Sequence, residues 1–116
     1  MLLLSILLPA YEYKEGIERI LNGIMKCDRD DLNKIEIIIG DDSKREIINK
    51  KEINLYKEKI PNFEYIFNKK RHNINNWNNL LMLSRGKFLW LLHHDEIITK
   101  PKKSIKNILN HLSIKK

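Results

Sequence analysis

Three short apolar runs, each followed at once by polar residues, constrain the fold of this chain most strongly. The runs are Leu2 to Leu8, Ile35 to Ile39 and Phe88 to Leu92, and only Ser5 and Glu36 interrupt them. Runs of this length, rich in leucine and isoleucine, are typical of strands buried on both faces of a parallel sheet. We therefore expect a buried sheet with helices on both sides.

The segments between these runs predict helices and one further strand. A shorter strand is expected at 63–67, after Pro61. Apolar residues recur at helical spacing at 14–27, more loosely at 43–60, around 77–84 before Gly86, and from Pro101 to Leu112. The order strand-helix, repeated four times, predicts an α/β fold with a mostly parallel sheet flanked by helices. A single domain, 1–116, accounts for the whole chain.

Composition limits the classes of partner and compartment. The formal net charge of +7 favours an anionic partner: nucleic acid, an acidic membrane surface or a phosphorylated ligand. No aromatic platform or recognition helix is evident, so we expect no nucleic acid. The apolar start lacks a basic region and a cleavage site, which argues against a signal peptide. A lone cysteine, Cys27, cannot form an internal disulfide, so we expect a cytoplasmic location.

Polar side chains gather where three of the expected strands end. They are Pro9 to Glu12, Asp41 to Ser43 and His93 to Glu96. In an open α/β sheet, ligands bind beyond the carboxyl ends of the strands, so these segments form one candidate site. Carboxylates suit Mg²⁺ or Mn²⁺, with Asp95 as the natural ligand and Glu96 assisting. Neighbouring histidines of an extended segment point apart, so we do not expect zinc.

A second polar segment, 68–79, carries basic and asparagine side chains. Arg71 and its neighbouring lysines are suited to phosphate, and the asparagines to a base or sugar. An exposed basic loop leading into a helix is the alternative. We expect Trp77 to lie in the core.

The three strand ends together resemble a known family. "SILLPAYE", "IEIIIGDDS" and "GKFLWLLHHDE" resemble the start of family 2 glycosyltransferases with the GT-A fold, and "NNWNNLLMLSRGKFLWLLHHDE" is similar to members that carry Trp-Asn in the third helix. In the metal motif Asp-x-Asp of that family, His93 stands for the first aspartate and Asp95 for the last. Glu12 stands where asparagine is usual.

The resemblance implies a nucleotide-diphosphate sugar donor, a saccharide or lipid-linked acceptor, and Mn²⁺ or Mg²⁺ to steady the departing diphosphate. It assigns Asp95 and Glu96 to the metal. The nucleotide-sugar residues that we predict are Pro9, Ala10, Tyr11, Glu12, Asp41, Asp42, Arg71, Asn78, His93 and His94.

The resemblance covers about Ser5 to Leu112, which corresponds to the donor-binding half of the family. The acceptor half, with the catalytic base, would follow, so we expect a domain truncated before it. A non-catalytic nucleotide-sugar-binding module or docking fragment is therefore the main alternative. A receiver-like signalling domain is a further alternative, but it needs a phospho-accepting Asp at the end of a central strand and a Lys at the end of another, and neither "FEYIFNKK" nor "FLWLLHHDE" supplies both.

The last segment, 101–116, has basic and apolar faces and permits two interpretations. It contacts an anionic membrane peripherally, or it packs its apolar face on the sheet. An oligomer is also possible.

Overall fold

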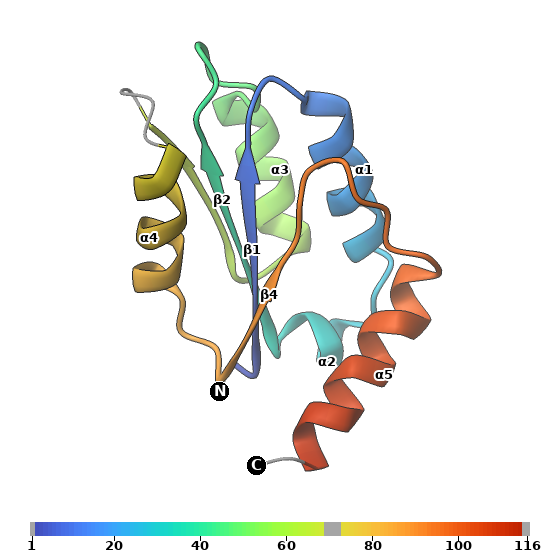
Figure 1. Ribbon diagram of the computed structural model, residues 1–116. Helices are drawn as coiled ribbons and strands as arrows, with labels where there is room; N and C mark the ends of the chain where they lie inside the picture. Colours follow the sequence, from blue (N-terminus) through green and yellow to red (C-terminus); the bar gives the residue numbers. More distant parts are fainter. Residues whose placement is uncertain (1, 69–72, 115–116) are drawn as a thin grey trace.

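Four parallel strands form one sheet in the order β3-β2-β1-β4 in the computed structural model, which describes residues 2–68 and 73–114 (Figure 1). The strands are β1 (Leu4–Ala10), β2 (Ile35–Asp41), β3 (Phe63–Phe67) and β4 (Phe88–Leu91). Because all pairs are parallel, the carboxyl ends of the strands lie at the same edge of the sheet. The predicted α/β fold with a parallel sheet between helices is confirmed.

Helices cover the two faces of the sheet unequally. They are α1 (Lys14–Ile24), α2 (Arg29–Leu32), α3 (Lys50–Lys59), α4 (Asn73–Leu83) and α5 (Pro101–Ile114). Side chains of α1, α3 and α5 pack with Ile6 and Leu8 of β1 in the main core. On the opposite face, Leu7 packs with Ile38 and with Leu80 of α4, which stands apart from the other helices in Figure 1. Alternate residues of β1 therefore serve different cores.

Two predicted elements differ from the structure. The helix expected at 43–60 begins only at Lys50, because the side chain of Asn49 accepts a hydrogen bond from the backbone N–H of Glu52 and caps it. The expectation that β4 is buried on both faces is wrong. Leu89 and Leu91 are 49% and 37% exposed, since β4 is an edge strand and α4 packs over β1 and β2.

The start of β4 is fixed by a buried carboxylate inside the sheet. Glu36 is 3% exposed and accepts hydrogen bonds from the Ser5 hydroxyl (2.6 Å) and the Arg85 guanidinium (3.1 Å). The Ser5 hydroxyl in turn accepts from the backbone N–H of Gly86 (2.8 Å). Burial raises the pKa of Glu36, but the hydrogen bonds from Ser5 and Arg85 outweigh it and hold the pKa below its ordinary value. This network ties the α4–β4 connection to β1 and β2.

Helix α5 packs its apolar face on the sheet. Ile105 and Leu109 are buried in the main core, while Lys102 and Lys106 pair with Asp28. The interpretation that the helix covers the sheet is thus confirmed, and a membrane contact would have to use the lysine face. Across residues 2–68 and 73–114 no helix is long and apolar enough to cross a membrane. Membrane contact, oligomer formation and a cytoplasmic location stay predictions.

Candidate functional site

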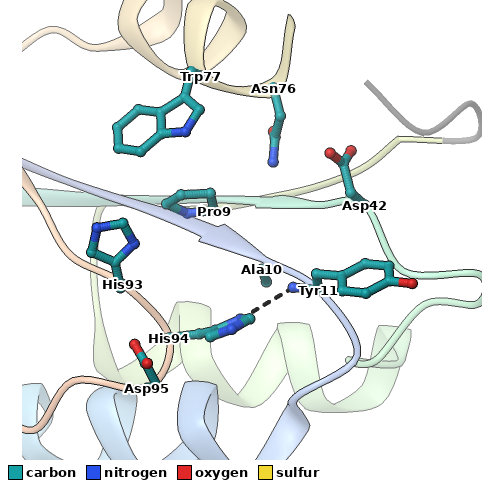
Figure 2. A pocket seen from close by; sticks show the side chains of 9 residues that line it. All are labelled: Pro9, Ala10, Tyr11, Asp42, Asn76, Trp77, His93, His94 and Asp95. Carbon is teal, nitrogen blue, oxygen red and sulfur yellow. Dashed lines mark hydrogen bonds between the residues drawn. The ribbon is translucent and has the colours of Figure 1, made fainter. Parts of the chain in front are cut away.

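A pocket opens at the carboxyl edge of the sheet, where three strand ends meet the start of α4 (Figure 2). Its volume is about 560 Å³, within the range of small-molecule sites. The residues that line it are Pro9, Ala10, Tyr11, Asp42, Asn76, Trp77, His93, His94 and Asp95. Three predicted residues far apart in the chain, Tyr11, Asp42 and Asp95, thus reach one pocket.

The floor of the pocket is formed where β1 ends. The backbone N–H of Tyr11 donates to Nδ1 of His94 (3.2 Å), drawn as a dashed line in Figure 2. The His94 ring also meets the ring of Tyr13 edge-on, with centroids 5.4 Å apart. Because its Nδ1 accepts a hydrogen bond from the backbone, a neutral His94 carries its proton on Nε2. His94 therefore joins the β1 end to the β4 end.

The wall beneath α4 carries the Asp42 carboxylate. Asp42 is 6% exposed, and its Oδ1 accepts a hydrogen bond from Nδ2 of Asn68 (2.8 Å). Asn68 also donates to Oδ1 of Asn76 (3.0 Å), and Nδ2 of Asn76 donates to the carbonyl of Gly40 (3.0 Å). A Cβ atom on Gly40 would lie 2.1 Å from Oδ1 of Asn76. Glycine at this strand end therefore makes room for the Asn76 amide.

The remaining wall is formed where β4 ends. The His93 ring lies against Trp77, with ring centroids 6.1 Å apart and an angle of 74° between the planes. Figure 2 shows His93 between Trp77 and the carboxylate of Asp95. Both His93 and Asp95 are exposed, so they reach solvent and a ligand alike.

Several predicted residues do not line the pocket. Asp41 is fully buried and accepts hydrogen bonds from the backbone N–H groups of Ser43 (2.9 Å) and Ile47 (3.1 Å) and from the Tyr65 hydroxyl. Burial, and then the hydrogen bond to Asp41, raise the pKa of Tyr65, so its phenol stays a donor. Asp41 thus organises the loop after β2 and does not line the pocket.

Glu12, Glu96 and Asn78 also lie outside the pocket lining. Oε2 of Glu12 accepts from the backbone N–H of Lys44 (3.1 Å), and Oε1 of Glu96 accepts from the backbone N–H of His93 (2.8 Å). Asn78 is exposed on α4. Arg71 lies outside the described residues.

Sequence reasoning missed Asn76 and the position of Trp77. Asn76 is 3% exposed and lies one helical turn before the buried Leu80, so an i, i+4 pairing would have identified it as sheet-facing. Gly40, directly after a run of isoleucines, marks the same close approach. Trp77 was expected in the core but lines the pocket instead.

The carboxylates at the pocket fit a divalent cation only in part. Over the portion of the chain that the structure describes, no three His, Cys, Asp or Glu side chains are grouped as a complete metal site. Mg²⁺ often takes one or two protein carboxylates and completes its shell with water and substrate phosphates. Asp95 fits that mode because it is exposed at the pocket, whereas Glu96 turns toward His93.

Comparison with known proteins now assigns the family. The sequence profile described as "Glycosyl transferase family 2" matches residues 5–113. The chain belongs to glycosyl transferase family 2. The resemblance drawn from the strand ends is therefore confirmed at the level of the family. Among curated protein sequences, none matches this chain.

Solved structures of the same fold include S. aureus TarS. TarS 1–349 in complex with UDP-GlcNAc superposes with a TM-score of 0.79 at 20% identity, covering 97% of this chain and 31% of that chain. The complex with UDP gives 0.78 at 20% identity, with 97% and 32% covered. TarS itself gives 0.78 at 19% identity, with 97% and 20% covered. This chain thus spans a third or less of these TarS chains, and the likeness shows the fold.

Proposed function

We propose that the chain binds the donor of a glycosyltransferase reaction, a nucleoside-diphosphate sugar, in the pocket at the carboxyl edge of the sheet. The observation that carries this proposal is the meeting of Tyr11, Asp42 and Asp95 in one pocket of a family 2 chain. TarS 1–349, which has the same fold, forms complexes with UDP and with UDP-GlcNAc, and this supports a nucleotide sugar as the ligand.

The pocket offers each part of such a ligand a suitable surface. Pro9 and Tyr11 present flat faces for a planar base, and Asp42 offers a carboxylate that accepts a hydrogen bond from a base N–H. His93 and His94 are within the same pocket and supply ring N–H donors for sugar hydroxyls or phosphate oxygens. The base therefore belongs at the Asp42 end and the diphosphate at the Asp95 end.

We propose that Asp95 shares Mn²⁺ or Mg²⁺ with the diphosphate, while Glu96, the other predicted ligand, keeps its carboxylate on the backbone N–H of His93. When bound, the cation neutralises charge that grows on the departing diphosphate. Asp42 and Asp95 would otherwise repel a polyphosphate, so the cation also allows the anion to enter.

Transfer of the sugar to a saccharide or lipid-linked acceptor is the activity that follows from the family. One observation favours a second candidate, a donor-binding module without turnover. Asp42 and Asp95 are the carboxylates among the lining residues of this pocket, and both are assigned to the donor. No described residue of the pocket is left as a carboxylate base for the acceptor hydroxyl.

Calorimetry with UDP, GDP and dTDP, each with and without Mn²⁺, tests the donor site. We expect Mn²⁺ to strengthen binding of at least one of them by about tenfold, roughly 1.4 kcal/mol. Asp95→Ala should lose this enhancement, and Asp42→Ala should weaken binding with or without the cation. Asp30→Ala, at an exposed position of α2, is the matched control and should bind as the wild type does.

Weak nucleotide binding with the same affinity in the presence and absence of Mn²⁺, and with equal affinity in the wild type and Asp95→Ala, would contradict the proposal. Hydrolysis of a sugar nucleotide by the wild type would separate an enzyme from a silent binding module. Loss of that hydrolysis in Asp95→Ala would place the reaction in this pocket.

A further inference from the structure

Behind the Asp42 carboxylate lies a chain of hydrogen-bonded amides, of which Asn76 lines the pocket and Asn68 does not. It runs from the Gly40 carbonyl through the side chains of Asn76 and Asn68 to Oδ1 of Asp42, with distances of 3.0, 3.0 and 2.8 Å. The members come from the ends of β2 and β3 and from α4. We call these three side chains, Asn76, Asn68 and Asp42, the amide relay.

The direction of every hydrogen bond in the amide relay is fixed. A backbone carbonyl can only accept, so the Asn76 amide must turn its NH₂ group toward Gly40 and its Oδ1 toward Asn68. Asn68 then donates both hydrogens of Nδ2, one to Oδ1 of Asn76 and one to Oδ1 of Asp42. No member can flip its amide without losing a bond. The relay is therefore a rigid support rather than a set of adaptable surface contacts.

Two members of the amide relay are buried, so a substitution that leaves one of their polar groups unpaired destabilises the fold. Asn76 is 3% exposed and Asp42 is 6% exposed. A Cβ atom on Gly40 would lie 2.1 Å from Oδ1 of Asn76, so β2 and α4 approach closely at this point. An amide is an unusual choice for a buried position of α4, since Leu80 fills the equivalent position one turn later. The geometry calls for a hydrogen-bonding group there, not for volume alone.

We propose that Asn68 and Asn76 are positioning residues that hold the Asp42 carboxylate as a directed acceptor and so select the base of the donor. This inference rests on the proposed nucleotide site. Asn68 occupies Oδ1 of Asp42, and among the described residues no hydrogen bond reaches Oδ2, which is left to accept from the ligand. Uracil presents N–H at ring position 3, whereas cytosine presents a lone pair there. A fixed carboxylate attracts the first and repels the second.

The test measures the affinities for UDP and for CDP by calorimetry at one Mn²⁺ concentration. It compares the ratio of the two affinities between the wild type and variants of the full chain. Asn68→Ala removes the donor to Asp42, and Asn68→Asp keeps the shape but removes both hydrogens. Both variants should lower the preference for UDP over CDP by about tenfold, as for loss of a hydrogen bond to a charged group. Asn54→Ala, at an exposed asparagine of α3, should leave the preference unchanged.

A double-mutant cycle separates positioning from general support. If Asn68 acts through Asp42, then Asn68→Ala should change UDP affinity less than about twofold in an Asp42→Ala background. Thermal unfolding of each variant checks that it is folded. Equal weakening of UDP and CDP, or an unchanged loss in the Asp42→Ala background, would overturn the inference and make the relay purely structural.

The same data distinguish the two proposals. A wild type that binds UDP and CDP equally well keeps the donor pocket and refutes base selection by Asp42. A wild type that binds neither UDP nor CDP refutes base selection, and it refutes the donor site as well if GDP and dTDP also fail to bind. UDP preference that falls in both Asn68 variants, and is absent in Asp42→Ala, supports both.

Discussion

Substituting Gly40 by alanine tests the close approach of β2 and α4. No glycine with positive φ occurs among the described residues, so the backbone at Gly40 accepts alanine without strain. The new Cβ would instead lie 2.1 Å from Oδ1, 3.0 Å from Cγ and 3.3 Å from Nδ2 of Asn76. The whole Asn76 amide must therefore move away.

The cost follows from the bonds that Asn76 makes. Its displacement breaks the bonds to the Gly40 carbonyl and to Asn68. Each is worth ~1 kcal/mol, and a buried group left unpaired adds ~1–3 kcal/mol. Alanine regains ~0.5–1 kcal/mol over glycine in a strand. We expect Gly40→Ala to lower the free energy of unfolding by ~2–4.5 kcal/mol.

Urea unfolding followed by circular dichroism measures this change. With a slope of about 2 kcal/mol per molar, within the range for small domains, the midpoint should fall by about 1–2 M. Gly23→Ala is the control, because Gly23 lies in α1 and an alanine there meets only Pro101, at 3.1 Å. We expect it to change stability by less than ~1 kcal/mol.

The double variant Gly40→Ala/Asn76→Ala decides whether the clash is the cause. In the Asn76→Ala background, Gly40→Ala should cost less than ~0.5 kcal/mol, because the atoms that it strikes are gone. A stability for Gly40→Ala within ~0.5 kcal/mol of wild type would refute the reasoning. So would an equal cost in both backgrounds.

Three further substitutions or reactions test other parts of the fold. Glu36→Gln should destabilise the protein at neutral pH, and the difference in stability from wild type should shrink as pH falls below about 4.5. The reason is that the pKa of Glu36 is lowered in the folded state, so its carboxylate stabilises the fold only while it is ionised. Urea midpoints from pH 7 to 3 measure this difference, and a pH-independent difference would contradict the role of the carboxylate. Lys106→Met should lower the urea midpoint, because it takes the cation from the carboxylate of buried Asp31 (3.0 Å). Exposed Lys103→Met should leave the midpoint unchanged, and equal effects of the two variants would refute the role of the pair. Burial, and then the charge of Asp31, raise the pKa of the Cys27 thiol to about 11. At pH 8 a disulfide reagent should therefore label Cys27 slowly in the native protein and fast in urea. Fast labelling of the native protein would contradict the burial of this thiol.

The sequence predicted the sheet well because strand signals here are local. Phe63–Phe67 and Ile35–Asp41 begin and end close to the predicted residues, since each is a β-branched or aromatic run bounded by polar or turn residues. Burial of β4 was mispredicted because exposure depends on which helix covers which strand. The apolar side chains of Leu89 and Leu91 do not indicate which strands α4 covers.

The strand-end rule brought Tyr11, Asp42 and Asp95 together, but it did not separate Asp41 from Asp42. Adjacent strand-end residues point to opposite faces, and the choice between the faces depends on Tyr65, a partner 24 residues away. Asn78 was chosen over Asn76 although a sequence signal favoured Asn76. It lies four residues before the buried Leu80, and this spacing places both side chains on the face of α4 that meets the sheet.

An NMR titration of the ¹⁵N-labelled protein with UDP and Mg²⁺ tests most directly whether the pocket at the carboxyl edge of the sheet is the donor site. We predict that the largest shifts fall on the backbone amides of Tyr11, Asp42 and His94, and that traces of Mn²⁺ broaden the amide of Asp95 first. Shifts confined to the lysines of α5, such as Lys102 and Lys106, or no shifts at all, would contradict the account.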